Sequence, residues 1–195
     1  MPVNNNDIRI QKTLLRKESK AFRANLSDDE KQRLDRKIAN RFLNLWYFRE
    51  NELLLTFVSN SIEVDTKFII QQALEQGKRV AVPRCIDGTR NMVFYLINSF
   101  DDLSPRSFDI LEPSEEKCEQ LTDYSGGLCI VPALVFDTNG FRLGFGKGYY
   151  DRFLSNSNVK TVGICYDGCI SNELPHGKYD KKVSMIVTES RIIDF

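Results

Sequence analysis

The sequence lacks the features that would assign it to a nucleic-acid-binding or membrane class. Lys plus Arg equals Asp plus Glu at 27 each among 195 residues. A balanced chain has no general affinity for nucleic acid or anionic membrane. No apolar run approaches the length of a membrane span, and residues 1–6 lack the hydrophobic core of a secretory signal. We therefore expect a cytoplasmic protein without nucleic-acid or membrane partners. The basic segment 9–23 also carries Glu18, so we assign it to the folded domain, with mitochondrial import as the alternative.

Metal-binding patterns of cysteine and histidine are also missing. The chain has five cysteines, an odd number, and only Cys165 and Cys169 lie close together, as C-x-x-x-C. There is no C-x-x-C pair, and the one histidine, His176, stands alone. A structural zinc site is therefore not expected. Reduced cysteines in a cytosolic protein are the simplest interpretation.

Helical and strand patterns alternate along the chain. A basic helix opens the sequence, and Ser27 with Glu30 forms a capping-box pattern before a helix whose apolar positions run to Leu45. Asp65 or Thr66 caps a further helix that ends at Gly77, and a last helix covers 149–154. The predicted strands are 53–58, 79–82 (stopped by Pro83), 93–97, 128–131, 159–165 and, as the last one, 183–187. Residues 98–126 are interpreted as loop with one short helix at most.

This alternation predicts the fold class. Strands that alternate with helices form a mainly parallel α/β sheet with helices on both faces. The hydrophobic content of 42% supports a substantial core. Because there is no internal repeat and no clear boundary, we expect a single domain over residues 1–195.

A glycine-rich segment is the most informative part of the sequence. Within nine residues it contains Gly140, Gly144, Gly146 and Gly148. Glycines let backbone N–H groups approach a ligand closely. Arg142 and Lys147 add positive charge, and a helix that starts near Tyr149 directs its positive end to the same place. Together these features favour a phosphate cradle, with a glycine-rich surface turn as the alternative.

The segment matches neither common nucleotide-binding motif. In a Walker A loop counted back from Gly146 and Lys147, the first glycine falls on Phe141, and Gly148 replaces the Ser or Thr. The spacing of Gly144, Gly146 and Gly148 also lacks the G-x-G-x-x-G pattern of dinucleotide sites. The carboxylate that follows, Asp151, suits a magnesium ion beside phosphates. An acid that stabilises the start of a helix is the equal alternative for Asp151.

The whole segment 137–154, D-x-x-G-x-R-L-G-x-G-x-G-Y-Y-D-R-F-L, resembles the signature of the 5-formyltetrahydrofolate cyclo-ligase family, also called methenyltetrahydrofolate synthetases. Further elements match in the family's order over nearly the whole chain. These are Lys12-x-x-x-Arg16, Ser59-x-x-x-Glu63-x-x-Thr66, Val82-Pro83, Met92–Phe94, Leu111–Pro113, Val131-Pro132, and Leu174-Pro175 followed by Asp180.

The resemblance implies a fold and an activity. The fold is a three-layer α/β/α domain similar to the ribose-phosphate isomerase and CoA-transferase group. The activity converts 5-formyltetrahydrofolate to 5,10-methenyltetrahydrofolate with ATP and Mg²⁺, through a phosphorylated formyl group, and releases ADP and phosphate. Such chemistry depends on positioning and on neutralising phosphate charge rather than on many acid–base groups. A sequence with one histidine is consistent with a reaction that needs few acid–base groups. We also expect the protein to be a monomer.

The resemblance also implies the site residues. ATP binds to Lys12, Arg16, Arg142, Leu143, Gly144, Phe145, Gly146, Lys147, Gly148, Tyr149 and Tyr150. The folate binds to Val58, Glu63, Phe145, Gly146, Lys147, Gly148 and Tyr149. The implied catalytic residues are Lys12, Arg142, Lys147 and Tyr149. Mg²⁺ binds to Asp151 and Asp180.

Several of these residues have an alternative interpretation when taken alone. Lys12 and Arg16 share a helix face, which without the resemblance is a solvated basic face. Glu63 suits the paired donors of a pterin but is otherwise an exposed acid before a helix. Asp180 is otherwise a loop acid flanked by lysines. The two tyrosines, 149 and 150, are otherwise core or interface aromatics.

The chain departs from the family at several positions. Tyr179 stands where many relatives have His, Cys169 where many have Gln, and Lys147 where many bacterial members have Gly. His176 does not align with the family histidine and is given no role. Two other hypotheses remain, a degenerate homologue that binds folate or nucleotide without turnover, and another ATP-using enzyme on the same scaffold. The intact loop from Arg142 to Asp151, the acid Asp180 and Lys12 argue against the first, and Glu63 argues against the second.

Overall fold

The computed structural model describes residues 5–106, 111–177 and 180–195, with side chains from residue 8 onward. The helices are α1 (Asn5–Ala24), α2 (Asp28–Leu43), α3 (Trp46–Glu50), α4 (Lys67–Glu75) and α5 (Tyr149–Ser155), with 3₁₀ turns η1 (Phe100–Asp102) and η3 (Asp167–Cys169). The strands are β1 (Leu53–Leu55), β2 (Arg79–Cys85), β3 (Met92–Ile97), β4 (Leu103–Pro105), β5 (Leu111–Pro113), β6 (Gln120–Leu121), β7 (Gly127–Val131), β8 (Val135–Asp137), β9 (Arg142–Leu143), β10 (Lys160–Ile164), β11 (Ile170–Ser171), β12 (Met185–Val187) and β13 (Ile192–Asp194).

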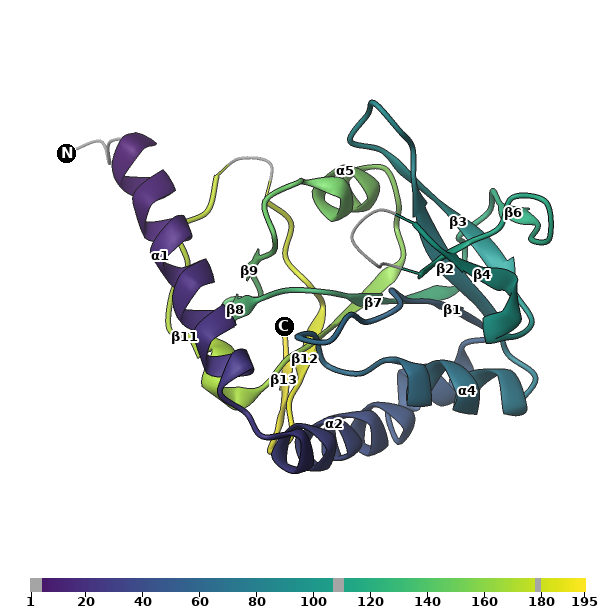
Figure 1. The fold of residues 1–195 in the computed structure, drawn as a ribbon, viewed down its shortest axis with the longest axis horizontal. Coiled ribbons are helices and arrows are strands. Elements are labelled where there is room, and N and C mark those ends of the chain that lie inside the picture. Colours follow the sequence, from purple (N-terminus) through teal and green to yellow (C-terminus); the bar gives the residue numbers. More distant parts are fainter. Residues whose placement is uncertain (1–4, 107–110, 178–179) are drawn as a thin grey trace.

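The large sheet has the strand order β13-β12-β10-β7-β1-β2-β3-β6. The neighbours from β12 to β2 are parallel, and the outer pairs β12–β13, β2–β3 and β3–β6 are antiparallel. Figure 1 shows α2 and α4 along one face of the sheet and α5 on the other. The predicted mainly parallel sheet with helices on both faces is therefore confirmed.

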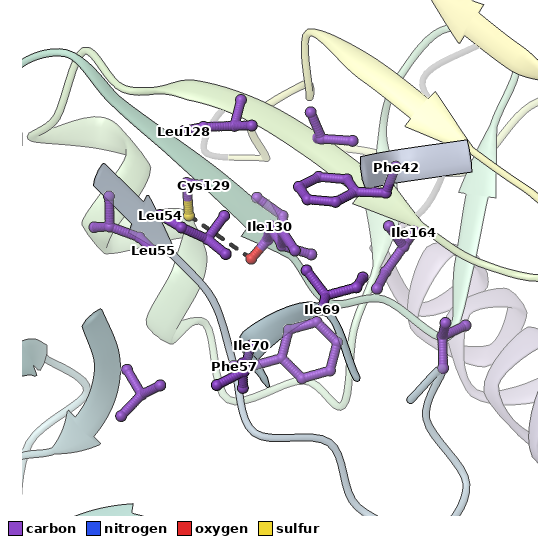
Figure 2. Close-up of a cluster of buried hydrophobic side chains, with 14 of the residues drawn as sticks. Phe42, Leu54, Leu55, Phe57, Ile69, Ile70, Leu128, Cys129, Ile130 and Ile164 are labelled. Carbon is purple, nitrogen blue, oxygen red and sulfur yellow. Dashed lines mark hydrogen bonds between the residues drawn. The ribbon is translucent and has the colours of Figure 1, made fainter. Parts of the chain in front are cut away.

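The centre of the sheet explains the apolar runs in the sequence. Strand β1 pairs with β7 on one side and β2 on the other, and all three of its leucines are buried. A strand buried on both faces needs a continuous apolar run rather than an alternating one. Figure 2 shows Leu54, Ile130 and Ile164 of the strands packed with Phe42 of α2 and Ile69 of α4.

The second helix begins as the capping pattern predicts. The Ser27 hydroxyl accepts a hydrogen bond from the Glu30 N–H at 3.3 Å. The apolar spacing predicts a helix as far as Leu45, but α2 ends at Leu43 and Asn44 occupies the C-terminal cap. Leu45 then precedes the short helix α3, which the sequence analysis did not find.

Proline does not stop β2, so that prediction is wrong. The strand continues through Pro83 to Cys85 and pairs there with β3. Strand β1 pairs only with Arg79–Ala81, so beyond Ala81 this edge of β2 has no strand partner among the described residues. Proline is tolerated on such an edge because no ladder hydrogen bond is lost there.

Short strands account for most of the other differences. The predicted loop 98–126 contains β4, β5 and β6, and the predicted strand 53–58 forms a ladder only over Leu53–Leu55. The predicted strand 183–187 is confirmed as β12, but it is not the last strand, because β13 follows it and pairs antiparallel with it. Segments of two or three residues are too short for a periodic signal.

No helix within the described ranges is long and apolar enough to cross a membrane. All five cysteines are free thiols, and four of them are buried. No cluster of three His, Cys, Asp or Glu side chains suited to a metal ion occurs in the part of the chain that the structure describes.

Candidate active site

The sheet topology marks one crevice as the place for a ligand. From β1 the chain passes through α4 to β2 on one side, and from β7 it passes through α5 to β10 on the other. Ligands of open α/β sheets bind outside the carboxyl ends of the strands where the order reverses in this way. Segment 56–66 follows β1 and segment 132–148 follows β7, so both leave the sheet at this point.

A buried aspartate shapes the start of the glycine-rich loop. Asp137 ends β8 and is fully buried. One of its carboxylate oxygens accepts hydrogen bonds from the N–H groups of Asn139 and Phe141, each at 2.9 Å. The other accepts the Leu174 N–H at 2.9 Å. Asp137 thereby fixes the turn between β8 and β9 and places Arg142 on β9.

Two glycines with left-handed backbone conformations bring the loop to α5. Gly146 has φ of 95° and Gly148, the residue before the helix, has φ of 77°. A Cβ at Gly146 would lie 3.2 Å from a terminal guanidinium nitrogen of Arg16. The glycine therefore lets the guanidinium lie against the loop backbone. The predicted helix start near Tyr149 is confirmed.

The first helix lies along this loop. The Arg16 Nε donates to the Gly144 carbonyl at 2.9 Å, and the Lys12 Nζ lies 2.9 Å from a carboxylate oxygen of Asp180. Lys12 and Arg16 therefore do not form a helix face that contacts solvent alone, and that alternative interpretation is wrong. Both side chains hold parts of the predicted ATP site together.

Two ion pairs join the predicted phosphate-binding cations to the predicted metal ligands. Arg142 donates to Asp151 at 2.5 Å and also to the Lys181 carbonyl at 2.7 Å. Lys12 pairs with Asp180 in the same way. Burial raises the pKa of Asp180, but hydrogen bonds from Lys12 and the Gly177 N–H outweigh it, so the pKa lies below its ordinary value. Asp180 is therefore ionised at neutral pH.

The two carboxylates fit a magnesium ion that takes part of its coordination from phosphates. The side chains of Asp151 and Asp180 are 32% and 24% exposed, so each can offer an oxygen to a ligand. Mg²⁺ typically uses one or two carboxylates together with water and phosphate oxygens. The absence of a third acid in the described part of the site is consistent with this mode.

The predicted folate segment forms a compact loop after β1. Thr66 donates its hydroxyl proton to the Phe57 carbonyl at 2.7 Å and accepts the Ser59 N–H at 3.1 Å. Asp65, rather than Thr66, accepts a backbone N–H of the first turn of α4, that of Lys67, at 3.0 Å. Thr66 therefore closes the segment on itself, while Asp65 caps the helix.

Glu63 lies inside this loop. Its side chain belongs to a residue only 8% exposed, and one oxygen accepts the Asn60 N–H at 3.0 Å. Burial raises the pKa of Glu63, although the Asn60 N–H and the charge of Arg23 act in the opposite direction. The interpretation of Glu63 as an ordinary exposed acid is therefore wrong. Val58, the other predicted folate residue of the segment, is also buried.

Comparison with known proteins assigns the family. The profile of the 5-formyltetrahydrofolate cyclo-ligase family matches residues 8–189. The chain belongs to this family. A protein of Caenorhabditis elegans described as a probable 5-formyltetrahydrofolate cyclo-ligase is 30% identical over 96% of this chain and 97% of its own length. The 5-formyltetrahydrofolate cyclo-ligase of Mus musculus is 29% identical over 90% of this chain and 92% of its own.

Solved structures agree with this assignment. The 5,10-methenyltetrahydrofolate synthetase of Aquifex aeolicus superposes with a TM-score of 0.83 at 31% identity, over 94% of this chain and 92% of that chain. The Mycoplasma pneumoniae synthetase superposes with a TM-score of 0.74 over 92% of this chain and 99% of that chain. Its identity of 23% supports the shared fold alone.

A further arginine of α1 belongs to the site of this cyclo-ligase family member. Arg23 is 4% exposed. It donates to the Ile62 carbonyl at 3.0 Å and to the Ala133 and Leu134 carbonyls at 2.8 and 3.0 Å. It therefore ties the folate segment to the chain that follows β7. Sequence reasoning missed it, although its spacing of seven residues from Arg16 places both on one helix face.

The aromatic residues divide between surface and interior. Phe145 is 42% exposed, with the Lys20 ammonium 5.4 Å from its ring centroid. The Tyr149 hydroxyl faces the Thr89 carbonyl at 3.5 Å. The Tyr150 hydroxyl is buried and has no hydrogen-bond partner among the described residues, so its interpretation as a core aromatic holds in part. Burial raises the pKa of both tyrosines, so their phenols stay protonated.

The remaining predicted residues lie at the edge of the site or outside it. Lys147 is exposed and has no ion-pair partner within the described ranges. Cys169 is buried under α1, 3.4 Å from the Ser19 hydroxyl. His176 stacks on Phe141 with ring centroids 3.6 Å apart. Tyr179, a departure from the family pattern, lies outside the described residues.

Proposed function

We propose that this chain catalyses the ATP- and Mg²⁺-dependent conversion of 5-formyltetrahydrofolate to 5,10-methenyltetrahydrofolate, with release of ADP and phosphate. The observation that carries the proposal is the pair of ion pairs beside a buried carboxylate at the crevice of the sheet. The proposed phosphate-binding cations and Mg²⁺ ligands lie on α1, β9, α5 and the segment before β12, and the proposed pterin-binding acid lies on the loop after β1. The family membership supports the same activity.

The proposed reaction has two steps. The formyl oxygen attacks the γ-phosphorus of ATP, and the bond from that phosphorus to the bridging oxygen of ADP breaks. The N10 lone pair then attacks the activated formyl carbon, N10 gives its proton to solvent water, and the carbon–oxygen bond breaks to release phosphate. Phosphorylation is needed because an amide-like formyl carbon is a poor electrophile with a poor leaving group.

Charged side chains hold the nucleotide in this proposal. Lys12, Arg16 and Arg142 would bind the phosphates, and Lys147 of the exposed loop would add a further positive charge. Asp151 and Asp180 would hold the magnesium ion, which neutralises phosphate charge when bound. In this proposal catalysis rests on positioning and on electrostatic stabilisation.

The folate would bind on the other side of the same crevice. The Glu63 carboxylate matches the pterin N3–H and 2-amino donors, and a charge-assisted pair of this kind is strong and directional. Phe145 and Tyr149 offer ring faces for stacking on the pterin. Through its three carbonyl contacts, Arg23 holds the segment after β1 and the segment after β7, which form the two sides of the crevice, next to each other.

An absorbance assay tests the activity. Purified protein is mixed with 5-formyltetrahydrofolate, ATP and Mg²⁺, and the near-ultraviolet band of methenyltetrahydrofolate is followed. We expect a rise that requires all three components. Absence of a rise while calorimetry still detects binding of folate or ATP would contradict the proposal and indicate a degenerate binder or another substrate.

We further propose that the enzyme acts as a cytoplasmic monomer without nucleic-acid partners.

A further inference from the structure

A groove with a volume of about 620 Å³ lies between α2, the folate segment and the start of α4. Figure 1 shows α2 and α4 side by side on the same face of the sheet. Residues 58–61 form one wall, and Arg36, Lys67 and Phe68 belong to the helices that line it. The groove is outside the glycine-rich loop, so ATP contacts do not account for it.

The groove and the proposed pterin position share one backbone segment, the loop after β1. Val58 and Asn60 line it, and the Asn60 N–H is the group that holds the Glu63 carboxylate. A ligand fixed at Glu63 therefore has this groove along the same backbone segment. Folates carry a benzoyl group and a glutamate with two carboxylates beyond N10, so the part of the substrate that needs a second site is apolar and then anionic.

Two acids that line the groove are already bound by neighbouring groups. Asp35 pairs with Lys31 at 2.6 Å and accepts the Tyr166 hydroxyl at 2.7 Å. Asp65 accepts hydrogen bonds from Ser59 and from the backbone of α4. Their charges are therefore partly compensated from within the fold. Asp28, the third acid, opens the first turn of α2, where a negative charge is stabilised by the helix dipole.

Two cations of the groove have no such partner. Neither Arg36 nor Lys67 forms an ion pair within the part of the chain that the structure describes. The Arg36 guanidinium lies 3.8 Å from the centroid of the Phe68 ring. Stacking of this kind holds the guanidinium plane and leaves its edge free for a bidentate carboxylate. The groove thus offers a fixed anion site beside an aromatic face.

We propose that this groove binds the benzoylglutamate tail of the folate substrate. The benzoyl ring packs against Phe68 and Val58, and the glutamate carboxylates pair with Arg36 and Lys67. The inference rests on the proposed function, because it names where the rest of the same substrate binds. It assigns a folate-binding role to α2 and α4, which lie outside the predicted site residues.

The double variant Arg36→Ala/Lys67→Ala tests the proposal. Both side chains are exposed, so we expect the variant to fold. Loss of two charge-assisted contacts should raise the KM for 5-formyltetrahydrofolate about 10-fold to 100-fold, with kcat and the KM for ATP unchanged. The control variant Arg33→Ala/Lys37→Ala removes two exposed cations of α2 that do not line the groove, and its KM should equal that of the wild type.

A substrate without glutamate separates the two proposals. Calorimetry with 5-formyltetrahydropteroate should give the same Kd for the wild type and the groove variant, whereas 5-formyltetrahydrofolate should bind the variant more weakly. Equal folate affinities in both proteins would overturn the groove assignment and leave the proposed function standing. If the wild type formed no methenyltetrahydrofolate, the proposed function would fail, and the calorimetric comparison would still decide where the tail binds.

Discussion

Four charged side chains of the proposed ATP site neutralise one another in pairs. Arg142 holds Asp151, and Lys12 holds Asp180. Magnesium alone would take the acids and leave two partly buried cations unpaired. ATP alone would take the cations and leave two acids unpaired, which is also costly. When both ligands bind, Mg²⁺ pairs with the acids and ATP pairs with the cations, so no charged side chain is left unpaired. We therefore expect each ligand to bind much more tightly in the presence of the other.

Substitution of the acids tests this exchange of partners. In Asp151→Asn/Asp180→Asn, Lys12 and Arg142 lose their carboxylate partners and become available to phosphate oxygens. We expect Mg²⁺-dependent turnover to fall about 100-fold or more, while metal-free ATP binds more tightly than to the wild type. Calorimetry with ATP in the presence of a chelator measures the second effect. Weaker binding of metal-free ATP by the variant would contradict the exchange.

Glu63 combines a cost to stability with a role in binding. Burial raises its pKa, so the folded protein binds the proton more tightly than the unfolded chain does. The free energy of unfolding therefore falls as the pH rises from the ordinary glutamate pKa through the raised one. Because the pterin needs the ionised form, the KM for the folate should rise as the pH falls through the raised pKa.

The variant Glu63→Gln separates these two effects. The amide oxygen can still accept the Asn60 N–H, but the charge is gone. We expect a higher thermal midpoint than the wild type at neutral pH, together with a KM for 5-formyltetrahydrofolate raised about 10-fold to 100-fold. The KM for ATP should be unchanged. A lower midpoint with an unaltered folate KM would show that the carboxylate serves the fold alone.

At the scale of elements, α1 acts as a clamp on the glycine-rich loop. Arg16 bonds to the Gly144 carbonyl and lies against Gly146, and Arg23 reaches the chain after β7. The contacts of Arg16 form only when α1 lies close to the backbone of the glycine-rich loop. The loop conformation and the helix position therefore depend on each other.

Alanine substitutions at two neighbouring glycines test this clamp. Gly146→Ala places a Cβ 3.2 Å from Arg16 in a left-handed backbone conformation, whereas a Cβ at Gly144 meets nothing within 4 Å. We expect Gly146→Ala to cost about 1 kcal/mol or more in stability and to raise the KM for ATP. Gly144→Ala serves as the control for stability alone, which it should leave nearly unchanged. Equal stability of the two variants would argue against a backbone constraint at Gly146.

The sequence predicts some elements well and others poorly for identifiable reasons. The runs around Leu54 and Ile130 are apolar throughout because parallel strands are buried on both faces, and they were found. Strand β2 was cut short at Pro83 because the open edge beyond β1 is a property of pairing, which no local pattern encodes. The antiparallel strands β4 and β5 have three residues each and give no periodic signal.

The site residues also divide into those that the sequence predicts and those that it does not. The glycines of 140–148 with Arg142 and Lys147 predict a phosphate cradle, and the family resemblance adds Lys12 and Arg16. The structure places Arg16 against Gly144 and Gly146. The pairing of Lys12 with Asp180 joins residues 168 positions apart, and the pairing of Arg142 with Asp151 depends on how the glycine-rich loop folds back, so no local pattern predicts either one. Arg23 was missed because a buried arginine looks like a surface cation until its carbonyl partners are known.

At the scale of the whole molecule, the sheet joins the two halves of the chain. Strand β1 pairs with β2 from the first half and with β7 from the second, and the crevice lies where these halves meet. We propose, as the sequence analysis predicts, that the chain is a single domain. Denaturation followed by circular dichroism and by the fluorescence of Trp46 should give coincident transitions. Two separated transitions would contradict a single cooperative unit.

The destination of the formyl oxygen tests the central claim most directly. The substrate is labelled with ¹⁸O in the formyl group, one round of turnover is run with ATP and Mg²⁺, and the inorganic phosphate is examined by mass spectrometry. If the formyl oxygen is phosphorylated and leaves with the phosphate, one ¹⁸O atom appears in each phosphate released with methenyltetrahydrofolate. Unlabelled phosphate would contradict the account, because ATP cleavage would then be separate from activation of the formyl group.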